Sequence, residues 1–370
     1  MTDNLSGDVI VAGAGPAGIA AALRLAQRGV SDVVLLDAQD YPRDKTCGSG
    51  LSPRGIATLR ELGIWDKVEP HAYPIHGMIL TTPGDRKVDL PSEGLDVAVC
   101  LRRVLDFAML EAARELGVRF VPRFKVSELI MEGGRAVGVR ADDGREARGR
   151  QVVAATGAHT KIALDNVKHH QISTIMGWWE GVPFRPNWLE MVYDKMIAPY
   201  YGWLFPEGPD RVNIGITYHD PGVKVHAREL FERFLDKHYG DRLRDARRIG
   251  GYRGHPIVFS YNLPRLTSPG RLVIGEAGRM THPATGEGIS QGMRSGMMAA
   301  DAIVSILQRG VPEWAAYAGY EARCRVAFTP SFLAGGAFLK LAQTPMLDIA
   351  ADLSKDRRWE AVTRTVFSTL

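Results

Sequence analysis

Two kinds of apolar pattern divide the chain. Residues 8–12 and 33–36 are short, nearly unbroken apolar runs, and residues 19–27 between them carry Ala, Leu and Ile at helical spacing. Runs of this length predict buried, parallel-type strands, and the stretch between them predicts a helix. From residue 169 onward the runs are rich in aromatic residues. They predict a second, antiparallel sheet with strands over 172–179, 188–193, 200–205 and 212–218.

The same patterns predict further elements. Two short apolar segments within residues 77–90 flank Pro83-Gly84-Asp85, which is typical of a β-hairpin. Gly133-Gly134 and Asp143-Gly144 are typical hairpin turns. The remaining predicted helices cover residues 53–62, 102–116, 225–239 and 288–307, and the remaining strands cover 97–101, 118–121, 126–132, 136–140, 151–155 and 271–275.

The predicted domains are interleaved, because the buried-type strand over 271–275 and the helix after it return the chain to its first sheet. The predicted fold class is α/β, with a doubly wound, Rossmann-like domain, an antiparallel-sheet substrate domain and a helical C-terminus. The Thr329-Pro330 step and the glycines that follow it predict a bend in the C-terminal segment. We assign residues 1–76, 97–168 and 264–310 to the dinucleotide-binding domain, 77–96 and 169–263 to the substrate domain, and 311–370 to the C-terminal segment.

The first strand and helix are joined by the pattern Gly-x-Gly-x-x-Gly. The first glycine allows a tight turn, the second lets a pyrophosphate approach the backbone, and the third lets the helix pack closely on the strand. The phosphates then lie at the positive N-terminus of the helix, and the acid that ends the second strand accepts hydrogen bonds from ribose hydroxyls. This unit predicts dinucleotide binding without separating NAD from FAD. The candidate contact residues are Gly13, Gly15, Pro16, Ala17, Gly18, Asp37 and Ala38.

Composition narrows the class of protein. The 370 residues are 45% hydrophobic and carry a formal net charge of +4. We interpret the basic cluster Arg242, Arg244, Arg247 and Arg248 as a solvated helix face, with an anionic substrate or lipid headgroup as the alternative, and we expect no nucleic-acid partner. The three cysteines lack metal-ligand spacing, so we expect no metal site and a reducing, cytoplasmic setting. Charged and polar residues interrupt the apolar stretch 332–351, so we expect no membrane-spanning helix.

A long, irregular loop over residues 41–53 follows the second strand. Loops of this length are more often functional than idle. Its glycines permit a planar ligand to approach the backbone, and its basic residues could reach the phosphates of that ligand. The candidate cofactor-binding residues of this loop are Arg43, Lys45, Cys47, Gly48, Ser49 and Gly50.

A second glycine-rich unit extends from Gly275 to Gly292. It resembles the second flavin motif of the p-hydroxybenzoate-hydroxylase-like FAD proteins. The resemblance implies FAD as the cofactor, with Glu276 replacing the usual aspartate at the ribityl hydroxyls. The middle motif of the family carries an aspartate where this chain has Thr156, which weakens the case for a separate nicotinamide contact. Further flavin contacts implied by the family are Arg102, for which a surface arginine is the alternative, and Gly275, Gly286, Gly288 and Ile289.

Two further motifs resemble those of the geranylgeranyl reductases. Residues 42–53 resemble the cysteine-glycine loop of that family, and Tyr-Gly-Trp-Leu-Phe-Pro over 201–206, followed by a glycine, resembles its aromatic substrate motif. A strand that buries alternate aromatic rings in a core is the alternative for this motif. The substrate-binding residues implied by the resemblance are Trp203, Phe205, Pro206 and Gly215.

This resemblance implies an FAD-dependent reductase that saturates carbon–carbon double bonds of an isoprenoid or related apolar substrate. Flavin N5 supplies a hydride, and a protein acid supplies a proton, for which we select Cys47 and Tyr201 over Tyr200 and His282. The electron donor stays open between NAD(P)H and ferredoxin, as do the oligomeric state and peripheral membrane contact. The same fold supports monooxygenases and halogenases that use a flavin peroxide, and a non-catalytic flavin-binding protein is a third alternative.

Overall fold

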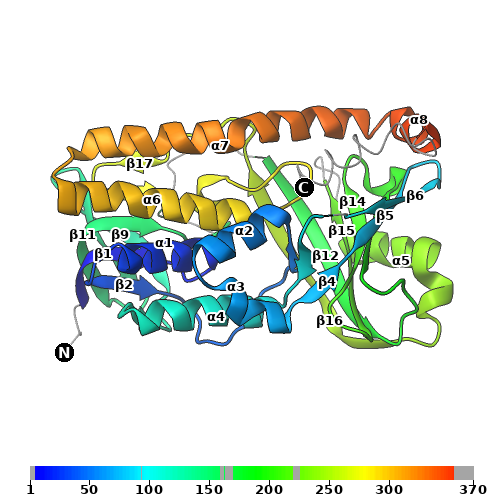
Figure 1. Ribbon diagram of the computed structural model, residues 1–370, viewed down its shortest axis with the longest axis horizontal. Coiled ribbons are helices and arrows are strands. Elements are labelled where there is room, and N and C mark those ends of the chain that lie inside the picture. The colour runs from blue at the N-terminus through cyan, green and yellow to red at the C-terminus, as the bar shows by residue number, and fades with distance from the viewer. Residues whose placement is uncertain (1–4, 93, 159–161, 163–169, 220–225, 354–370) are drawn as a thin grey trace.

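The computed structural model describes residues 5–92, 94–158, 162, 170–219 and 226–353. Two large sheets lie beside each other along the long axis, and the helix α7 (Glu313–Leu341) extends over both of them (Figure 1). The predicted α/β class is confirmed, with a doubly wound sheet, a mostly antiparallel second sheet and a helical C-terminal segment. Within the described ranges, no helix combines the length and apolarity needed to span a bilayer. Residues 354–370 of the predicted C-terminal segment lie outside the described residues.

The dinucleotide-binding sheet is built around β1 (Leu5–Ala12), which pairs in parallel with β2 (Val33–Leu36) and β11 (Glu146–Ala154). Val9 and Val11 face the cluster formed with the helices, whereas the alternate residues of β1 face the opposite side of the sheet. Because both faces are buried, the apolar run is unbroken. The other strands of this sheet are β8 (Arg119–Val121), β9 (Val126–Glu132), β10 (Arg135–Ala141), β17 (Thr267–Ser268) and β18 (Arg271–Val273).

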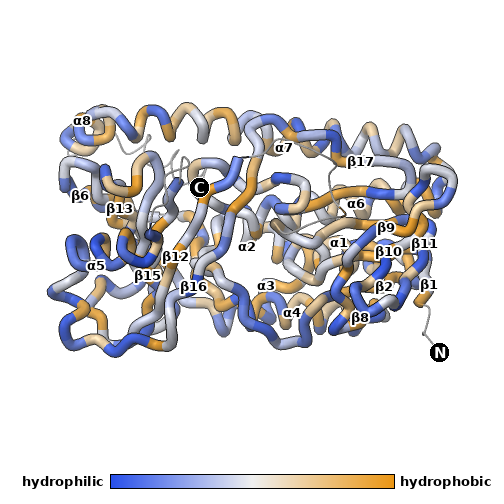
Figure 2. The backbone as a smooth tube through the Cα atoms, turned by 180° about the vertical axis from the view of Figure 1, so that it is seen from behind, coloured by the Kyte–Doolittle hydropathy of each residue, from blue (hydrophilic) through white to orange (hydrophobic). Residues whose placement is uncertain are grey.

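Two helices, α1 (Pro16–Gln27) and α6 (Ile289–Arg309), cross at close distance on this sheet. A Cβ atom at Gly296 would lie 2.3 Å from the Ala17 carbonyl oxygen, and one at Gly292 would lie 3.3 Å from the Ala17 Cβ atom. Small residues at the contact therefore let the two backbones approach closely. Apolar residues are frequent in this part of the molecule, where α1 and α6 lie near β1 and β2 (Figure 2).

A small third sheet fixes the end of the long loop. Gly50 of β3 (Gly50–Leu51) pairs with Val99 of β7 (Val97–Val99), which also pairs with β4 (Tyr73–Ile75). The loop then continues into α2 (Pro53–Glu61), whose N-cap Ser52 accepts a hydrogen bond from the Gly55 amide. The short helix α3 (Trp65–Val68) follows α2, and α4 (Arg102–Glu115) follows β7.

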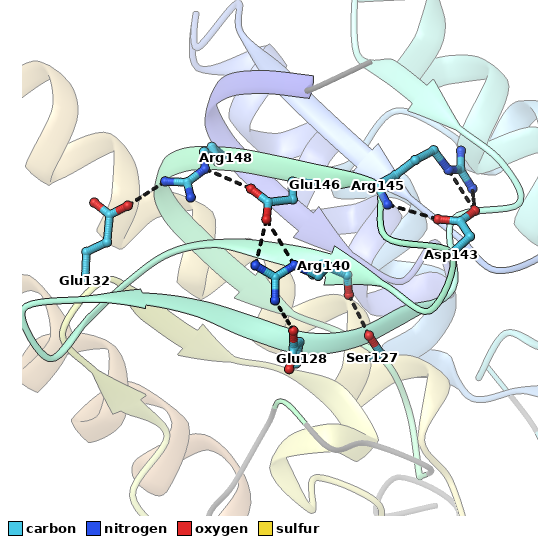
Figure 3. Close-up of polar contacts among 8 residues, drawn as sticks. All are labelled: Ser127, Glu128, Glu132, Arg140, Asp143, Arg145, Glu146 and Arg148. Carbon is cyan, nitrogen blue, oxygen red and sulfur yellow. Dashed lines mark hydrogen bonds and ion pairs between the residues drawn. The ribbon is translucent and has the colours of Figure 1, made fainter. Parts of the chain in front are cut away.

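The outer ribbon formed by β9, β10 and β11 carries a ladder of charges (Figure 3). Arg140 lies between Glu128 and Glu146, and Arg148 lies between Glu146 and Glu132. The two arginines hold the pKa of Glu146 below its usual range. Since these side chains face solvent, the pairs contribute little to stability and indicate a solvated face.

The second sheet has the strand order β16-β12-β15-β14-β13-β5-β6. The predicted hairpin is confirmed, because β5 and β6 pair in antiparallel register across the turn at Pro83-Gly84-Asp85. The helix α5 (Ala227–Leu243) packs against this sheet. The strands are β5 (Gly77–Thr81), β6 (Lys87–Pro91), β12 (His170–Glu180), β13 (Trp188–Tyr193), β14 (Tyr201–Pro206), β15 (Arg211–Tyr218) and β16 (Arg247–Phe259).

The structure corrects the interpretation of the basic cluster as one helix face. Arg242 lies in α5 and forms a two-pronged ion pair with Glu190, whereas Arg247 and Arg248 begin the edge strand β16. The sequence analysis predicts no strand there. The first eight residues of β16 include three Arg and three Gly, so no apolar period marks the strand.

Helix α7 continues through Pro330, so the Thr329-Pro330 step does not end the helix, and α7 ends before the short helix α8 (Met346–Leu353). The two glycines after Pro330 have a packing role. A Cβ atom at Gly335 would lie 2.8 Å from the His282 ring, and one at Gly336 would lie 2.7 Å from the Tyr261 ring. Gly335 therefore lets α7 pack closely against the loop that precedes α6, and Gly336 lets it pack against the segment that follows β16.

Replacing Gly296 with alanine tests the crossing of α1 and α6. The new methyl group must displace the Ala17 carbonyl, so we expect a loss of about 1–3 kcal/mol in the free energy of unfolding, measured by chemical denaturation. Gly319→Ala is the matched control, because Gly319 lies inside α7 and its Cβ atom would meet no described atom within 4 Å. The control should be neutral or up to about 1 kcal/mol more stable, as helix propensity predicts. Equal effects of the two substitutions would contradict the close crossing.

Candidate functional site

The glycine turn before α1 has the geometry that the sequence predicts. Gly13 has a φ of +110°, and a Cβ atom there would lie 2.3 Å from the Ala155 carbonyl oxygen. A Cβ atom at Gly18 would collide with the Gly13 carbonyl oxygen, whereas one at Gly15 would meet no described atom within 4 Å. Helix α1 also begins without a side-chain cap. The turn therefore offers open space beside Gly15, together with the Ala17 and Gly18 amides, for which the helix itself supplies no carbonyl acceptor.

Asp37 fixes this turn from the end of β2. Its carboxylate accepts hydrogen bonds from the Ala14 amide at 2.8 Å and from the Gln39 amide at 2.9 Å, beside Ala38. The Arg43 guanidinium lies 3.8 Å from Asp37 and 3.6 Å from Asp106. The start of the long loop is thereby held against the glycine turn, and the Asp37 carboxylate remains able to accept ribose hydroxyls.

Cys47 lies at the centre of the long loop. Its sulfur accepts a hydrogen bond from the Ser49 amide at 3.3 Å, and the Arg102 guanidinium lies close enough to interact with it electrostatically. Arg102 is buried, with two 2.7 Å hydrogen bonds to Asp106, so the alternative of a surface arginine is wrong. Lys45, in the same loop, has its pKa lowered to about 8, mainly by burial and then by Arg102. Cationic side chains therefore surround the Cys47 sulfur.

The loop packs directly against the aromatic strand β14. A Cβ atom at Gly48 would lie 3.3 Å from the Phe205 ring and 3.4 Å from the Trp203 indole nitrogen. Gly50 is similarly close to Phe205, with 3.4 Å from its Cβ position to the ring. Glycine at these two positions lets the backbone that carries Cys47 lie on the two rings. The predicted cofactor loop and the predicted substrate motif therefore meet.

Gly215 explains the spacing of the aromatic motif. It pairs with Trp203 across β14 and β15, and a Cβ atom at Gly215 would lie 2.3 Å from the indole ring. The indole N–H donates a 2.7 Å hydrogen bond to Asn213, which is fully buried. Pro206 pairs with Val212 at the end of the same ladder. The glycine thus gives the indole a fixed position on the sheet.

Tyr201 connects the aromatic strand to the loop before α6. Its hydroxyl donates a hydrogen bond to the Thr285 carbonyl oxygen. Burial, with the Cys47 and Glu287 side chains as smaller causes, raises the pKa of Tyr201 well above its usual range. A hydroxyl that donates to a carbonyl and has a raised pKa is a weak proton donor.

The second glycine-rich motif approaches the second sheet. Gly275 has a φ of +60° and packs against Ala17 of α1. The Glu276 carboxylate accepts a 3.2 Å hydrogen bond from the Val258 amide and lies 3.8 Å from the His255 imidazole. Strand β16, which sequence reasoning missed, therefore supplies the neighbours of Glu276.

The residues before α6 form the other helix N-terminus of the site. Helix α6 begins at Ile289 after Gly288, without a side-chain cap. The Glu287 carboxylate accepts hydrogen bonds from Ser52 of the long loop and from Gln291, and burial raises its pKa. Gly286 has a φ of +66°. The long loop and the start of α6 are thus joined through a buried carboxyl group.

His282 is held in its neutral form. Its Nδ1 atom accepts hydrogen bonds from the Ala284 and Thr285 amides at 3.3 and 3.2 Å, and its Nε2 atom lies 3.2 Å from the Ser331 carbonyl oxygen, to which it donates. Burial lowers its pKa to about 4. At neutral pH His282 therefore organises the loop and has no proton to give.

These residues fit FAD. In the described part of the chain, several buried polar atoms at the flavin motifs have no hydrogen-bond partner, which is costly unless a ligand satisfies them. These atoms are Arg43 Nε, Arg279 Nε and Nη1, Ser290 Oγ and Gln291 Oε1. Together with the open space at Gly15 and two uncapped helix N-termini, they match a ligand with a pyrophosphate and a polar ring edge.

A cavity of about 300 Å³ lies beside the long loop. Its lining includes four residues that the sequence predicts to bind the cofactor, Lys45, Cys47, Ser49 and Arg102, but none of the glycines of the two dinucleotide motifs. Sequence reasoning missed most of its other wall, because β16 carries no apolar period. The further lining residues are Asp44, Leu101, Arg103, Trp178, Glu207, Arg211, Ile249, Gly250, Gly251 and Arg253.

Comparisons with known proteins agree with this geometry. A family model described as an FAD binding domain matches residues 6–201. Menaquinone reductase of Mycobacterium tuberculosis is 32% identical over 331 residues, which cover 82% of this chain and 78% of that protein. A digeranylgeranylglycerophospholipid reductase of Methanocella arvoryzae is 28% identical over 342 residues, covering 88% and 84%. The crystal structure of a geranylgeranyl bacteriochlorophyll reductase-like protein from Thermoplasma acidophilum matches the fold with a TM-score of 0.83 at 24% identity, covering 94% and 91%.

The neutral state of His282 makes stability depend on pH. Its pKa is about 4 in the folded chain against 6.5 for an ordinary histidine. The stabilisation is therefore complete above pH 6.5 and is lost as the pH falls through 4. Between pH 7 and pH 4 we expect the wild-type free energy of unfolding to fall by about 3 kcal/mol more than that of His282→Asn, which keeps an acceptor for the two amides but does not titrate. If denaturant titrations gave wild type and His282→Asn the same dependence of the free energy of unfolding on pH, this account would be contradicted.

Proposed function

Since the chain belongs to the geranylgeranyl reductase family of FAD-binding flavoproteins, we propose that it saturates carbon–carbon double bonds of an isoprenoid or related apolar substrate. The observation that carries the proposal is the contact of the Cys47 loop with Trp203 and Phe205. This contact brings a cavity-lining thiol and the predicted cofactor loop against an aromatic sheet face.

A packed apolar cluster lies behind these rings. It contains three methionines, whose flexible side chains adapt to irregular apolar partners. Phe338 of α7 packs on Tyr193, with ring centroids 5.9 Å apart, so α7 covers the cluster. The main members are Met78, Met176, Leu189, Met191, Tyr193, Tyr201 and Trp203.

Bound and reduced FAD supplies the hydride for such a reaction, and the chain must supply a proton in a dry site. Cys47 lines the cavity, and its sulfur accepts a hydrogen bond from the Ser49 amide. Its own hydrogen is therefore left free to point toward the cavity. We assign the proton transfer to the Cys47 thiol. Tyr201 then acts as a positioning residue, because its hydroxyl is used by the Thr285 carbonyl.

The direct test is to mix the reduced enzyme with apolar alkenes. The FAD-loaded protein is reduced anaerobically and mixed with prenylquinones or prenyl diphosphates, and products are analysed by mass spectrometry. We expect a product two mass units heavier for each bond reduced, with simultaneous reoxidation of the flavin. Reoxidation by oxygen alone, with an oxygenated or halogenated product, would overturn the proposal in favour of flavin-peroxide chemistry.

Substituting Cys47 tests the source of the proton. Cys47→Ala should retain FAD and its reduction but lose alkene reduction by about 10²–10⁴-fold, the usual contribution of a positioned acid. Cys324→Ala is the matched control, because Cys324 is a buried free cysteine that packs in the helical core away from the cavity. Single-turnover rates measured with the same substrate compare the two variants. A Cys47→Ala rate within a few fold of wild type would exclude the thiol as the proton donor.

A further inference from the structure

The 300 Å³ cavity beside the long loop carries an excess of positive charge. Five cationic side chains line it against two carboxylates. The cations come from four separate parts of the fold, namely the long loop, the start of α4, β15 and β16. They are Lys45, Arg102, Arg103, Arg211 and Arg253, and the acids are Asp44 and Glu207.

Two of the cations already have carboxylate partners. Arg102 is held by the fully buried Asp106. Arg211 donates a 2.7 Å hydrogen bond to Glu207, whose other oxygen accepts a 3.0 Å hydrogen bond from the Trp178 indole. Burial raises the pKa of Glu207, so the indole and the guanidinium hold a carboxylate that the protein otherwise disfavours. The Glu207 carboxylate is thereby committed to Arg211 and Trp178.

Lys45, Arg103 and Arg253 then remain without these partners. The one other carboxylate among the lining residues is that of the exposed Asp44. Arg103 and Arg253 are exposed, and within the described residues no hydrogen bond or ion pair joins Lys45, Arg103 or Arg253 to an acid. Arg253 lies over the Trp178 ring, with 5.7 Å from its guanidinium carbon to the ring centroid. Lys45 is half-buried, and its lowered pKa shows that the other cations and the loss of water disfavour its charge. An anion in the cavity would offset both costs.

The backbone of β16 is also shaped around this cavity. Between the pairs Met176–Arg253 and Trp178–Ile249, one residue of β12 opposes three of β16, which forms a bulge. Gly250 in the bulge has a φ of +69°, and Cβ atoms at Gly250 and Gly251 would meet no described atom within 4 Å. Bulges often re-aim side chains next to binding sites. Here the bulge leaves open space between Ile249 and Arg253.

We propose that this cavity binds the phosphate groups of a small molecule through Lys45, Arg103 and Arg253. Guanidinium groups match phosphate oxygens in geometry, and an excess of cations in a cavity selects a multiply charged anion. No glycine of either dinucleotide motif lines the cavity, so it lies apart from the predicted pyrophosphate position of FAD, although Lys45, Cys47, Ser49 and Arg102 are also predicted flavin contacts. The phosphate belongs either to a prenyl diphosphate substrate or to a dinucleotide reductant. That assignment rests on the proposed function, whereas phosphate binding itself does not.

The first experiment measures binding of inorganic pyrophosphate to the FAD-loaded protein by titration calorimetry, without turnover. We expect the double variant Arg103→Gln, Arg253→Gln to bind pyrophosphate at least tenfold more weakly than wild type. Arg233→Gln is the matched control, because Arg233 is exposed on α5 and lies outside the cavity. It should bind like wild type. FAD content and melting temperature, measured on each variant, show that all of them are folded.

Competition then identifies the source of the phosphate. Displacement of pyrophosphate by geranyl diphosphate but not by geraniol assigns the site to the substrate, and displacement by NADPH or NADH assigns it to the reductant. The proposal is overturned if wild type does not bind pyrophosphate, if the double variant binds it with wild-type affinity, or if none of these phosphate compounds displaces it. These experiments measure binding and not turnover. They therefore test phosphate binding even if the proposed reductase activity is not found.

Discussion

The close crossing of α1 and α6 is the contact on which the rest of the site depends. Each helix begins after a glycine and lacks a side-chain cap, so its first amides are free, and the packing of Gly292 and Gly296 on α1 brings the two N-termini together. Two helix N-termini in one place make a strongly electropositive position that suits pyrophosphate at one end and an electron-rich ring at the other. Larger side chains at this contact would separate the two ends, even if every polar residue of the motifs were kept.

The long loop is the second element on which the site depends, because it connects the glycine turn, the segment before α6 and strand β14. Tyr41 donates to the Ala14 carbonyl in the glycine turn, Ser52 donates to Glu287 before α6, and Gly48 lies on the aromatic rings of β14. Each contact crosses from one unit of the fold to another. The position of Cys47 is thus set by all three units, and this explains how a loop without regular structure can hold a thiol at a fixed place in the cavity wall.

Much of this arrangement could be predicted from the sequence, because glycine and alternating apolar residues carry strong local signals. The turn at Gly13 is specified by its neighbours in sequence, and the strands that carry Trp203 and Gly215 follow from their apolar patterns, whereas the pairing of these two residues is seen only in the structure. The part of the cavity wall that β16 supplies, Arg253 included, could not be predicted, since β16 is an edge strand whose Arg and Gly residues face solvent or the cavity and leave no apolar pattern. The role of Gly335 and Gly336 could not be predicted either, since it depends on rings far away in the sequence: the two glycines let the continuous helix α7 pack closely against His282 and Tyr261.

The apolar and cationic parts of the site are joined by buried hydrogen bonds in the second sheet. The Trp203 indole donates to Asn213, whose amide donates at 3.1 Å to the carbonyl of Gly177, the residue before Trp178. Trp178 in turn donates to Glu207 at the cavity wall. Because Asn213 and Trp203 are buried, breaking one of these hydrogen bonds would leave an unsatisfied polar group. The hydrogen bonds therefore fix the positions of Trp203 and Trp178 relative to each other. A sheet that fixes an aromatic apolar face and a cationic cavity relative to each other is suited to a molecule with both an apolar chain and a charged end, and it would orient that molecule in one direction only.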